Sequence, residues 1–135
     1  MILLDTSVLS RVFRRRQPAA AERRLREVVD GLLAGDAPLG LPVIVLQEVL
    51  SGVRSERQFA ALENKLLSAF AIVHPLTDDY VGAARLRNRC LAKGLNVSGI
   101  DCLIATVAIS GAHELFAVDT DFPAIARHAP LKLYA

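Results

Sequence analysis

Five acidic residues, spread over most of the chain, are the side chains whose types and positions could carry out chemistry. They are Asp5, Glu48, Asp101, Asp119 and Asp121, and each lies in or beside an apolar run. Carboxylates that converge repel each other, by about 4 kcal/mol for a pair about 4 Å apart at an effective dielectric constant of about 20. Such a cluster is tolerated when the acids protonate, when helix N-termini offset the charge, or when a cation binds.

Taken one at a time, most of these acids have a simpler structural explanation. Asp5 and Asp121 both stand where a helix is expected to begin and could cap it. Asp101 forms a capping-box pattern with Ser98 in "SGID". Glu48 has no such explanation, because it lies in mid-helix within "VIVLQEVL" and no adjacent basic residue offers a partner. Taken together, the five acids favour a metal site.

The elements that must position these acids alternate between strand and helix. Strands are predicted at 1–4, 39–41, 71–73, 115–118 and 131–134, and helices at 6–15, 19–34, 42–53, 55–69, 77–93, 99–110 and from 121 onward. Pro18 breaks the first two helices apart, Pro42 fits a first helical turn, and Gly94 fits a left-handed helix end. The segment "VIVL" at 43–46 is also a good strand sequence. The alternation predicts an α/β fold over 1–135 as a single domain, a three-layer sandwich whose central, mostly parallel sheet has helices on both faces.

This topology would bring the acids to one edge of the sheet. Crossovers between parallel strands are right-handed, and their helices begin at the edge where the strands end. Asp5 and Asp119 would directly follow strands, and Asp101 would lie in the first turn of its helix, with Glu48 reaching in from one side. Open α/β sheets bind ligands at this edge. Asp121 would be a fifth acid there; we prefer Asp119 as the closer ligand, and the pattern leaves the choice open.

The composition narrows the classes of function. The 135 residues carry a net charge of +2, with 53% hydrophobic and 5% aromatic residues. We expect a cytoplasmic protein with free thiols, because no membrane span or signal peptide is evident and the two cysteines form no framework. Basic residues are concentrated in two stretches, seven arginines against Glu22 within 11–26 and the series Arg85, Arg89 and Lys93. This asymmetry suits a polyanion bound beside an acidic centre.

Four segments together resemble the acidic motifs of PIN-domain proteins. They are "LLDTSVL", "PVIVLQEVLSGV", "GIDCLIATVA" and "AVDTDF", in that order along the chain. The length and the opening "MILLDTS" look most similar to the VapC toxins of toxin–antitoxin pairs. The resemblance implies an endoribonuclease that depends on Mg²⁺ or Mn²⁺ and acts on RNA. It also implies a homodimer, inhibited by a cognate VapB-type antitoxin whose C-terminal tail lies across the site.

Carried over by position, the resemblance makes Asp5, Glu48, Asp101 and Asp119 the acids of the metal site. The ion's own ligands would be Asp5, Asp101 and Asp119. Their carboxylate oxygens are the donors that Mg²⁺ and Mn²⁺ prefer. Thr6 or Ser7 would hold Asp5 in place. The chain departs from the family pattern at Ala117, where many members have Thr or Ser.

Two other readings follow from the same residues. The fold could be an inactive module that binds RNA or a partner, with the acids as caps, although this leaves Glu48 unexplained. A phosphatase would need a second Asp two residues after Asp5, where this chain has Ser7. The helix over 19–34 carries more apolar residues than one buried face needs, so we expect Leu25 and Val29 to contact an antitoxin peptide.

Overall fold

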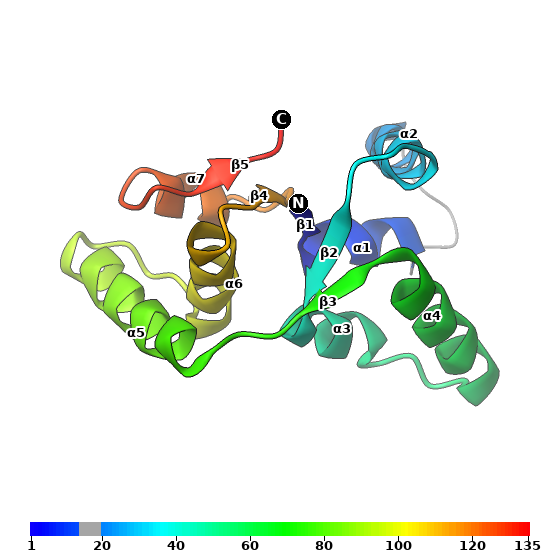
Figure 1. Cartoon of the computed structure of the whole chain (residues 1–135), viewed down its shortest axis with the longest axis horizontal. Coiled ribbons are helices and arrows are strands. Elements are labelled where there is room, and N and C mark those ends of the chain that lie inside the picture. Colours follow the sequence, from blue (N-terminus) through cyan, green and yellow to red (C-terminus); the bar gives the residue numbers. More distant parts are fainter. Residues whose placement is uncertain (14–19) are drawn as a thin grey trace.

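The centre of the molecule is a five-stranded sheet of order β3-β2-β1-β4-β5 (Figure 1). The computed structural model describes residues 1–13 and 20–135. The strands are β1 (Ile2–Leu4), β2 (Leu39–Pro42), β3 (Ala71–Val73), β4 (Glu114–Phe116) and β5 (Lys132–Leu133). All four strand pairings are parallel. The central strands β1 and β2 are buried along their whole length, which explains their uniformly apolar sequences.

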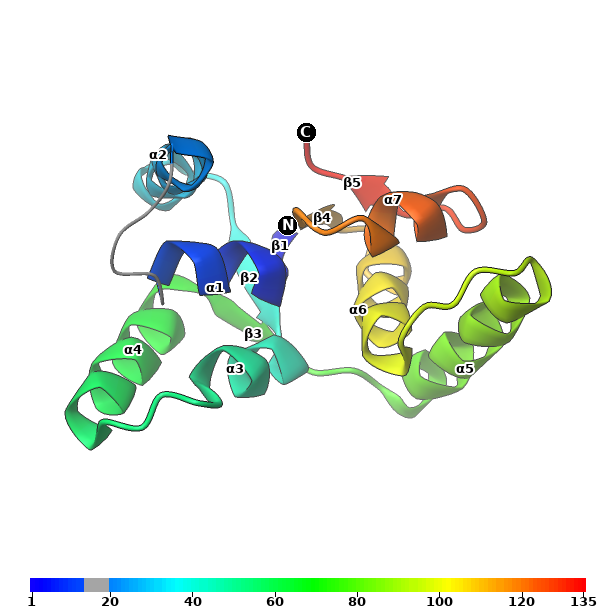
Figure 2. The same ribbon diagram turned by 180° about the vertical axis from the view of Figure 1, so that it is seen from behind.

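Helices cover the sheet on both sides, as Figures 1 and 2 show from opposite directions. They are α1 (Thr6–Phe13), α2 (Ala20–Ala34), α3 (Val43–Leu50), α4 (Glu56–Ala69), α5 (Thr77–Ala92), α6 (Gly99–Ser110) and α7 (Asp121–Ala126). The connections from β1 to β3 step in one direction across the sheet, and those leading to β4 and β5 step in the other. Right-handed crossovers therefore place α1–α4 and α5–α7 on opposite faces. The predicted three-layer α/β architecture is confirmed, with a sheet that is parallel throughout.

Several predicted boundaries shift for local reasons. Pro42 is the last residue of β2 and stands just before α3, so it is not in the first helical turn. Helix α3 ends at Leu50 and not at 53, because Ser51 is extended and Gly52 has a φ of 90°. Strand β4 ends at Phe116, two residues earlier than predicted. The expected helix ends at 14–15 and 19, with Pro18, lie outside the described residues.

The core is aliphatic, and one residue that we expected at a partner surface belongs to it. Val29 of α2 is 0% exposed and packs with the core residues of the sheet, so the prediction that it contacts an antitoxin is wrong. Its neighbour Val28 is 43% exposed, and Leu25 is partly buried. Cys90 and Cys102 are buried free thiols, as expected. Within the described residues, the search for a helix long and apolar enough to cross a membrane finds none.

Candidate acid site at the carboxyl edge of the sheet

The predicted acids gather where the sheet changes its winding direction. Strand β1 lies between β2 and β4, so the chain leaves neighbouring strands toward opposite sides and opens a crevice beyond their carboxyl ends. Asp5 directly follows β1 and is only 3% exposed. Its backbone N–H donates to the Phe116 carbonyl of β4 over 2.9 Å, which extends the pairing of the two strands to the site.

Ser7 fixes the carboxylate of Asp5. The Ser7 hydroxyl donates to Asp5 Oδ2 over 2.6 Å, and the Ser7 backbone N–H donates to the same oxygen over 3.1 Å. The second bond is a helix cap, so the capping explanation for Asp5 holds together with its place in the acid site. Ser7 Oγ also accepts from the Val118 backbone N–H over 3.1 Å. One hydroxyl therefore ties Asp5 to the segment that leads to Asp119.

Thr6 holds a different acid from the one expected. Its hydroxyl donates to Glu48 Oε1 over 2.7 Å, across 42 positions of sequence. Glu48 lies on α3, is half-buried, and contributes to raising the pKa of Asp5 by charge repulsion. The partner that sequence reasoning could not find for Glu48 is thus a hydroxyl. The sequence feature that indicates this partner is the pair Thr6 and Ser7 after Asp5, which supplies one hydroxyl donor to each of two carboxylates.

Asp101 lies among three other acids. Its backbone N–H donates to the Ser98 hydroxyl over 3.0 Å, which caps α6 as predicted. Burial raises the pKa of Asp101 to about 7, helped by a hydrogen bond with the Asp121 side chain and by repulsion from Asp119 and Asp5. Asp121 begins α7 without capping it, so its carboxyl group is available to Asp101. These contacts bring Asp101 and Asp121 together as a pair.

The pKa values of Asp119 and Asp5 are also raised, chiefly by burial. Burial raises the pKa of Asp119, with repulsion from Asp5 and Asp121, although the Asp121 backbone N–H donates to Asp119 Oδ1 over 3.0 Å and opposes the shift. Burial likewise raises the pKa of Asp5, and the Ser7 hydrogen bonds oppose it. We expected Asp119 to follow the strand directly. Because β4 ends at Phe116, two further residues lie between the strand and Asp119.

The five acids are close enough to interact, and their chemistry suits a hard cation. Every donor is a carboxylate oxygen, which favours Mg²⁺ or Mn²⁺ over zinc. A cation would also offset the repulsion and burial that raise the pKa values of Asp5, Asp101 and Asp119. In residues 1–13 and 20–135, no three His, Cys, Asp or Glu side chains are already placed to hold an ion together.

Beside Asp119 lies a hollow that the sequence did not indicate. It has a volume of about 560 Å³, and its lining includes Asp119, Thr120 and Arg127. Arg127 is exposed and directly follows the last residue of α7. It belongs to neither basic stretch identified in the sequence, and it lines the same hollow as Asp119.

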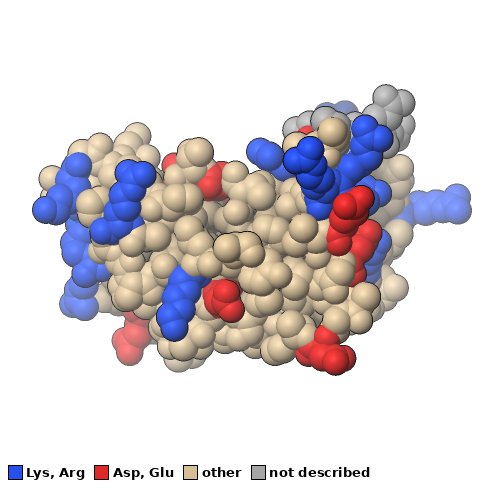
Figure 3. Space-filling view, turned by 90° about the horizontal axis from the view of Figure 1, so that it is seen from above, with Lys and Arg blue, Asp and Glu red and all other residues tan. Residues whose placement is uncertain are grey.

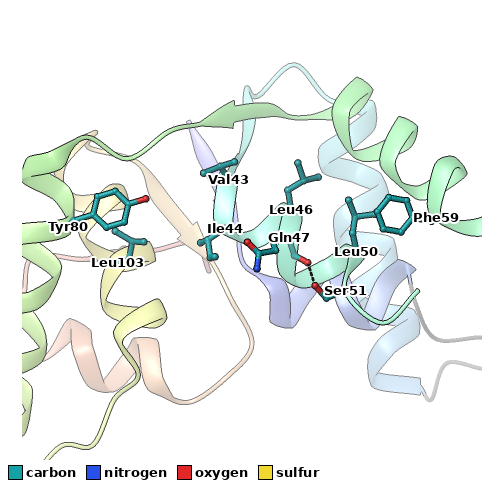
Figure 4. Close-up of a pocket in the computed structure, with 9 residues that line it drawn as sticks. All are labelled: Val43, Ile44, Leu46, Gln47, Leu50, Ser51, Phe59, Tyr80 and Leu103. Carbon is teal, nitrogen blue, oxygen red and sulfur yellow. Dashed lines mark hydrogen bonds between the residues drawn. The ribbon is translucent and has the colours of Figure 1, made fainter. Parts of the chain in front are cut away.

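A separate groove lies against the helices that carry Glu48 and Asp101. It has a volume of about 500 Å³ and contains none of the five acids. Figure 4 shows its lining side chains, from α3 and the adjacent Ser51, with Phe59 on one side and Tyr80 and Leu103 on the other. The lining is uncharged, and Tyr80 is 54% exposed.

Comparison with known proteins identifies the architecture. Residues 2–128 match the sequence profile of the PIN domain family. No curated protein sequence matches the chain. Among solved structures, FitAcB from Neisseria gonorrhoeae superposes with a TM-score of 0.78 at 23% identity, covering 100% of this chain and 97% of its own.

Two further structures are similar over nearly the same length. VapBC2 from Rickettsia felis, bound to a DNA fragment from its promoter, has a TM-score of 0.75 at 21% identity and covers 99% of this chain and 98% of its own. VapC20 from Mycobacterium tuberculosis, described as a toxin that cleaves the sarcin–ricin loop, has a TM-score of 0.74 at 18% identity. That match covers 92% of this chain and 94% of the toxin. At these identities the similarity establishes the shared fold.

Proposed function

The chain belongs to the PIN-domain family, and we propose that it is a metal-dependent endoribonuclease, the toxin of a VapBC-type toxin–antitoxin pair. The observation that carries the proposal is the convergence of Asp5, Asp101 and Asp119 at the carboxyl edge of the sheet, where the charges of Asp5 and Asp119 help to raise the pKa of Asp101 and the charge of Asp5 helps to raise that of Asp119. Glu48 and Asp121 complete the cluster. These acids stand in the four motifs that resemble those of the family.

Asp5, Asp101 and Asp119 are the residues that would hold Mg²⁺ or Mn²⁺. When bound, the ion would supply a water of lowered pKa and positive charge beside the scissile phosphate. The chain's own contribution is orientation: the hydroxyls of Thr6 and Ser7 hold two carboxylates in fixed directions, and that of Ser7 also joins the start of α1 to the segment after β4. Side chains held in this way lose less freedom when substrate binds.

RNA would lie across the acid edge with its phosphates on basic side chains. Figure 3 shows Lys and Arg side chains at both ends of one face, toward α2 and toward α5. Arg23 and Arg24 are exposed on α2, and Arg85 and Arg89 are exposed on α5. Flanking cations of this kind attract the backbone on either side of a cut.

We further propose a cytoplasmic protein with two protein partners, a VapB-type antitoxin and a second copy of itself. VapBC2 carries the VapBC name and VapC20 is described as a toxin, and the shared fold supports an antitoxin partner here. The uncharged groove in Figure 4 suits the second copy, because homodimer interfaces are more apolar than the rest of a protein surface. Tyr80→Glu should convert the dimer to monomer in light scattering, and a wild-type monomer would contradict this part of the proposal.

The decisive test is cleavage of a structured RNA pool by purified protein with Mg²⁺ or Mn²⁺, with EDTA, and as the variant Asp101→Asn. Cleavage that requires the metal and disappears in the folded variant would support the proposal. Asp36→Asn, which removes an exposed acid from the loop before β2, is the matched control and should cleave as wild type does. Tight RNA binding without cleavage, unaffected by EDTA, would instead favour an RNA-binding module.

A further inference from the structure

We propose that a pocket between α2 and the end of β4 binds an unpaired base of the substrate RNA; the inference rests on the proposed function. We call it the α2 pocket, and its volume is about 560 Å³. This volume lies within the range of about 300–1,000 Å³ that is usual for small-ligand sites. Val118 is part of its lining and directly precedes Asp119, so the chain runs from the pocket straight to one of the site acids.

The walls of the α2 pocket are apolar and come from distant parts of the chain. Leu25 and Val28 contribute from α2, Phe116 from the last position of β4, and Tyr134 from the segment after β5. The wall formed by α2 is held in place, because the Arg26 guanidinium donates to the Val12 carbonyl of α1 over 2.6 Å. The pocket is therefore a feature of the packed fold.

Two of the chain's few aromatic rings meet in this pocket. The ring centroids of Phe116 and Tyr134 are 5.2 Å apart, and the planes are inclined by 51°. Phe116 is 8% exposed, whereas Tyr134 is only partly buried and is the ring that a ligand can reach. Unpaired bases of RNA bind by stacking on such rings.

The charges around the pocket suit a nucleotide. Arg11 of α1 and Arg24 of α2 are exposed in its lining, and Glu22 is the acid of the lining. Arginine binds phosphate through two parallel hydrogen bonds, so a base on Tyr134 could have its phosphate on either guanidinium. An acidic amphipathic peptide would also find apolar walls and arginines here. An RNA base is favoured because the pocket combines a reachable ring with two exposed arginines, and Val118 of its lining directly precedes Asp119 of the acid site.

The experiment measures binding of a short, fluorescein-labelled RNA of mixed sequence by anisotropy, in the Asp101→Asn background so that the RNA stays intact. Tyr134→Leu keeps apolar volume but removes the ring, and we expect RNA to bind about 5- to 100-fold more weakly. Tyr134→Phe keeps the ring and should bind as the parent does. Arg24→Gln should lower the slope of log affinity against log salt by about 1, whereas Arg57→Gln, on the distant α4, should leave it unchanged.

A second measurement locates the contact directly. RNA containing 4-thiouridine should crosslink under ultraviolet light to a peptide that includes Tyr134 or residues of α2. If the parent binds RNA but Tyr134→Leu and Arg24→Gln bind equally well, the pocket is not a base site and the proposed function stands. If a synthetic Glu- and Leu-rich peptide, and not RNA, loses affinity in these variants, the pocket serves a protein partner. If the parent binds no RNA, both proposals fail.

Discussion

The Thr6 hydroxyl donates a hydrogen bond of 2.7 Å to Glu48 Oε1 and so joins the start of α1 to the middle of α3. Hydrogen bonds to charged groups contribute about 1.5–3 kcal/mol, so Thr6→Val should lower the free energy of unfolding by about that amount. Thr6→Ser keeps the hydroxyl and should lose much less. Urea titrations of Thr6→Val, Glu48→Gln and the double variant would measure the coupling. Additive losses would show that the bond contributes nothing in solution.

Ser7 has a different role, because its single hydroxyl both donates to Asp5 and accepts from the Val118 N–H. Ser7→Ala leaves the buried Asp5 carboxylate and the half-buried Val118 N–H without this partner and should lower the free energy of unfolding by about 1–3 kcal/mol. RNA cleavage should fall more steeply than stability, since Asp5 Oδ2 loses the hydroxyl bond and keeps the one from the Ser7 backbone N–H. The matched control is Ser68→Ala, because the Ser68 hydroxyl bonds only a carbonyl of its own helix at an exposed position. Equal cleavage by Ser7→Ala and wild type would contradict the orienting role.

The pH dependence of stability should reveal Asp101. Its pKa rises from 3.8 to about 7 on folding, chiefly through burial. Below the lower value both states hold the proton and the residue has no effect. Between the two values the unfolded chain ionises while the folded protein keeps its proton, so the contribution to stability falls as the pH rises, and it is fully unfavourable above the upper value.

Asp101→Asn cannot ionise, and so its stability relative to wild type should increase across this pH range. Because Asp101 is only half-buried, solvent screening should limit the gain to about 1 kcal/mol at alkaline pH without metal. Thermal unfolding of both proteins in EDTA at several pH values measures it. The exposed Asp36→Asn should show no such trend. A difference between Asp101→Asn and wild type that does not vary with pH would mean that folding does not raise the pKa of Asp101.

The sequence predicted the order of the strands well because each strand is short and each of the first four is followed by a helix. The predicted boundaries were wrong where a residue fits both the strand and the segment that follows it. Pro42 fits both the end of a strand and the start of a helix, and the run at 115–118 is apolar beyond the point where pairing ends. There the Val118 N–H leaves the strand pairing and bonds to Ser7. Only the folded chain supplies that partner.

The site residues divide in the same way. The convergence of the acids could be predicted from the topology. That Thr6 bonds Glu48 while Ser7 bonds Asp5, and that Arg127 lines the same hollow as Asp119, depends on side-chain packing. The wrong prediction that Val29 of α2 contacts an antitoxin also depends on packing that the sequence does not show. Two adjacent valines look alike in sequence, and the orientation of the helix alone makes Val29 part of the core and leaves Val28 at the surface.

This difference gives a direct test of α2. Val29→Ala removes two buried methyl groups and should lower the free energy of unfolding by about 1–3 kcal/mol. Val28→Ala, one position earlier and 43% exposed, should change it by less than about 0.5 kcal/mol. Denaturant midpoints of the two variants give the comparison, with the Val28 variant as the control. Equal losses would mean that α2 is rotated relative to the structure.

Manganese should stabilise the folded protein if the acids hold it, because the ion binds the folded chain only. At a concentration of about 100 times the dissociation constant the gain would be about 2.7 kcal/mol, seen as a rise in melting temperature. Asp119→Asn should remove most of this rise. Asp121→Asn should remove less, because the Asp121 carboxyl group already pairs with Asp101 while its backbone N–H supports Asp119. Asp36→Asn should retain the full rise. The reverse order for the two site variants would make Asp121 the closer ligand, and an equal rise in all three would place the ion elsewhere.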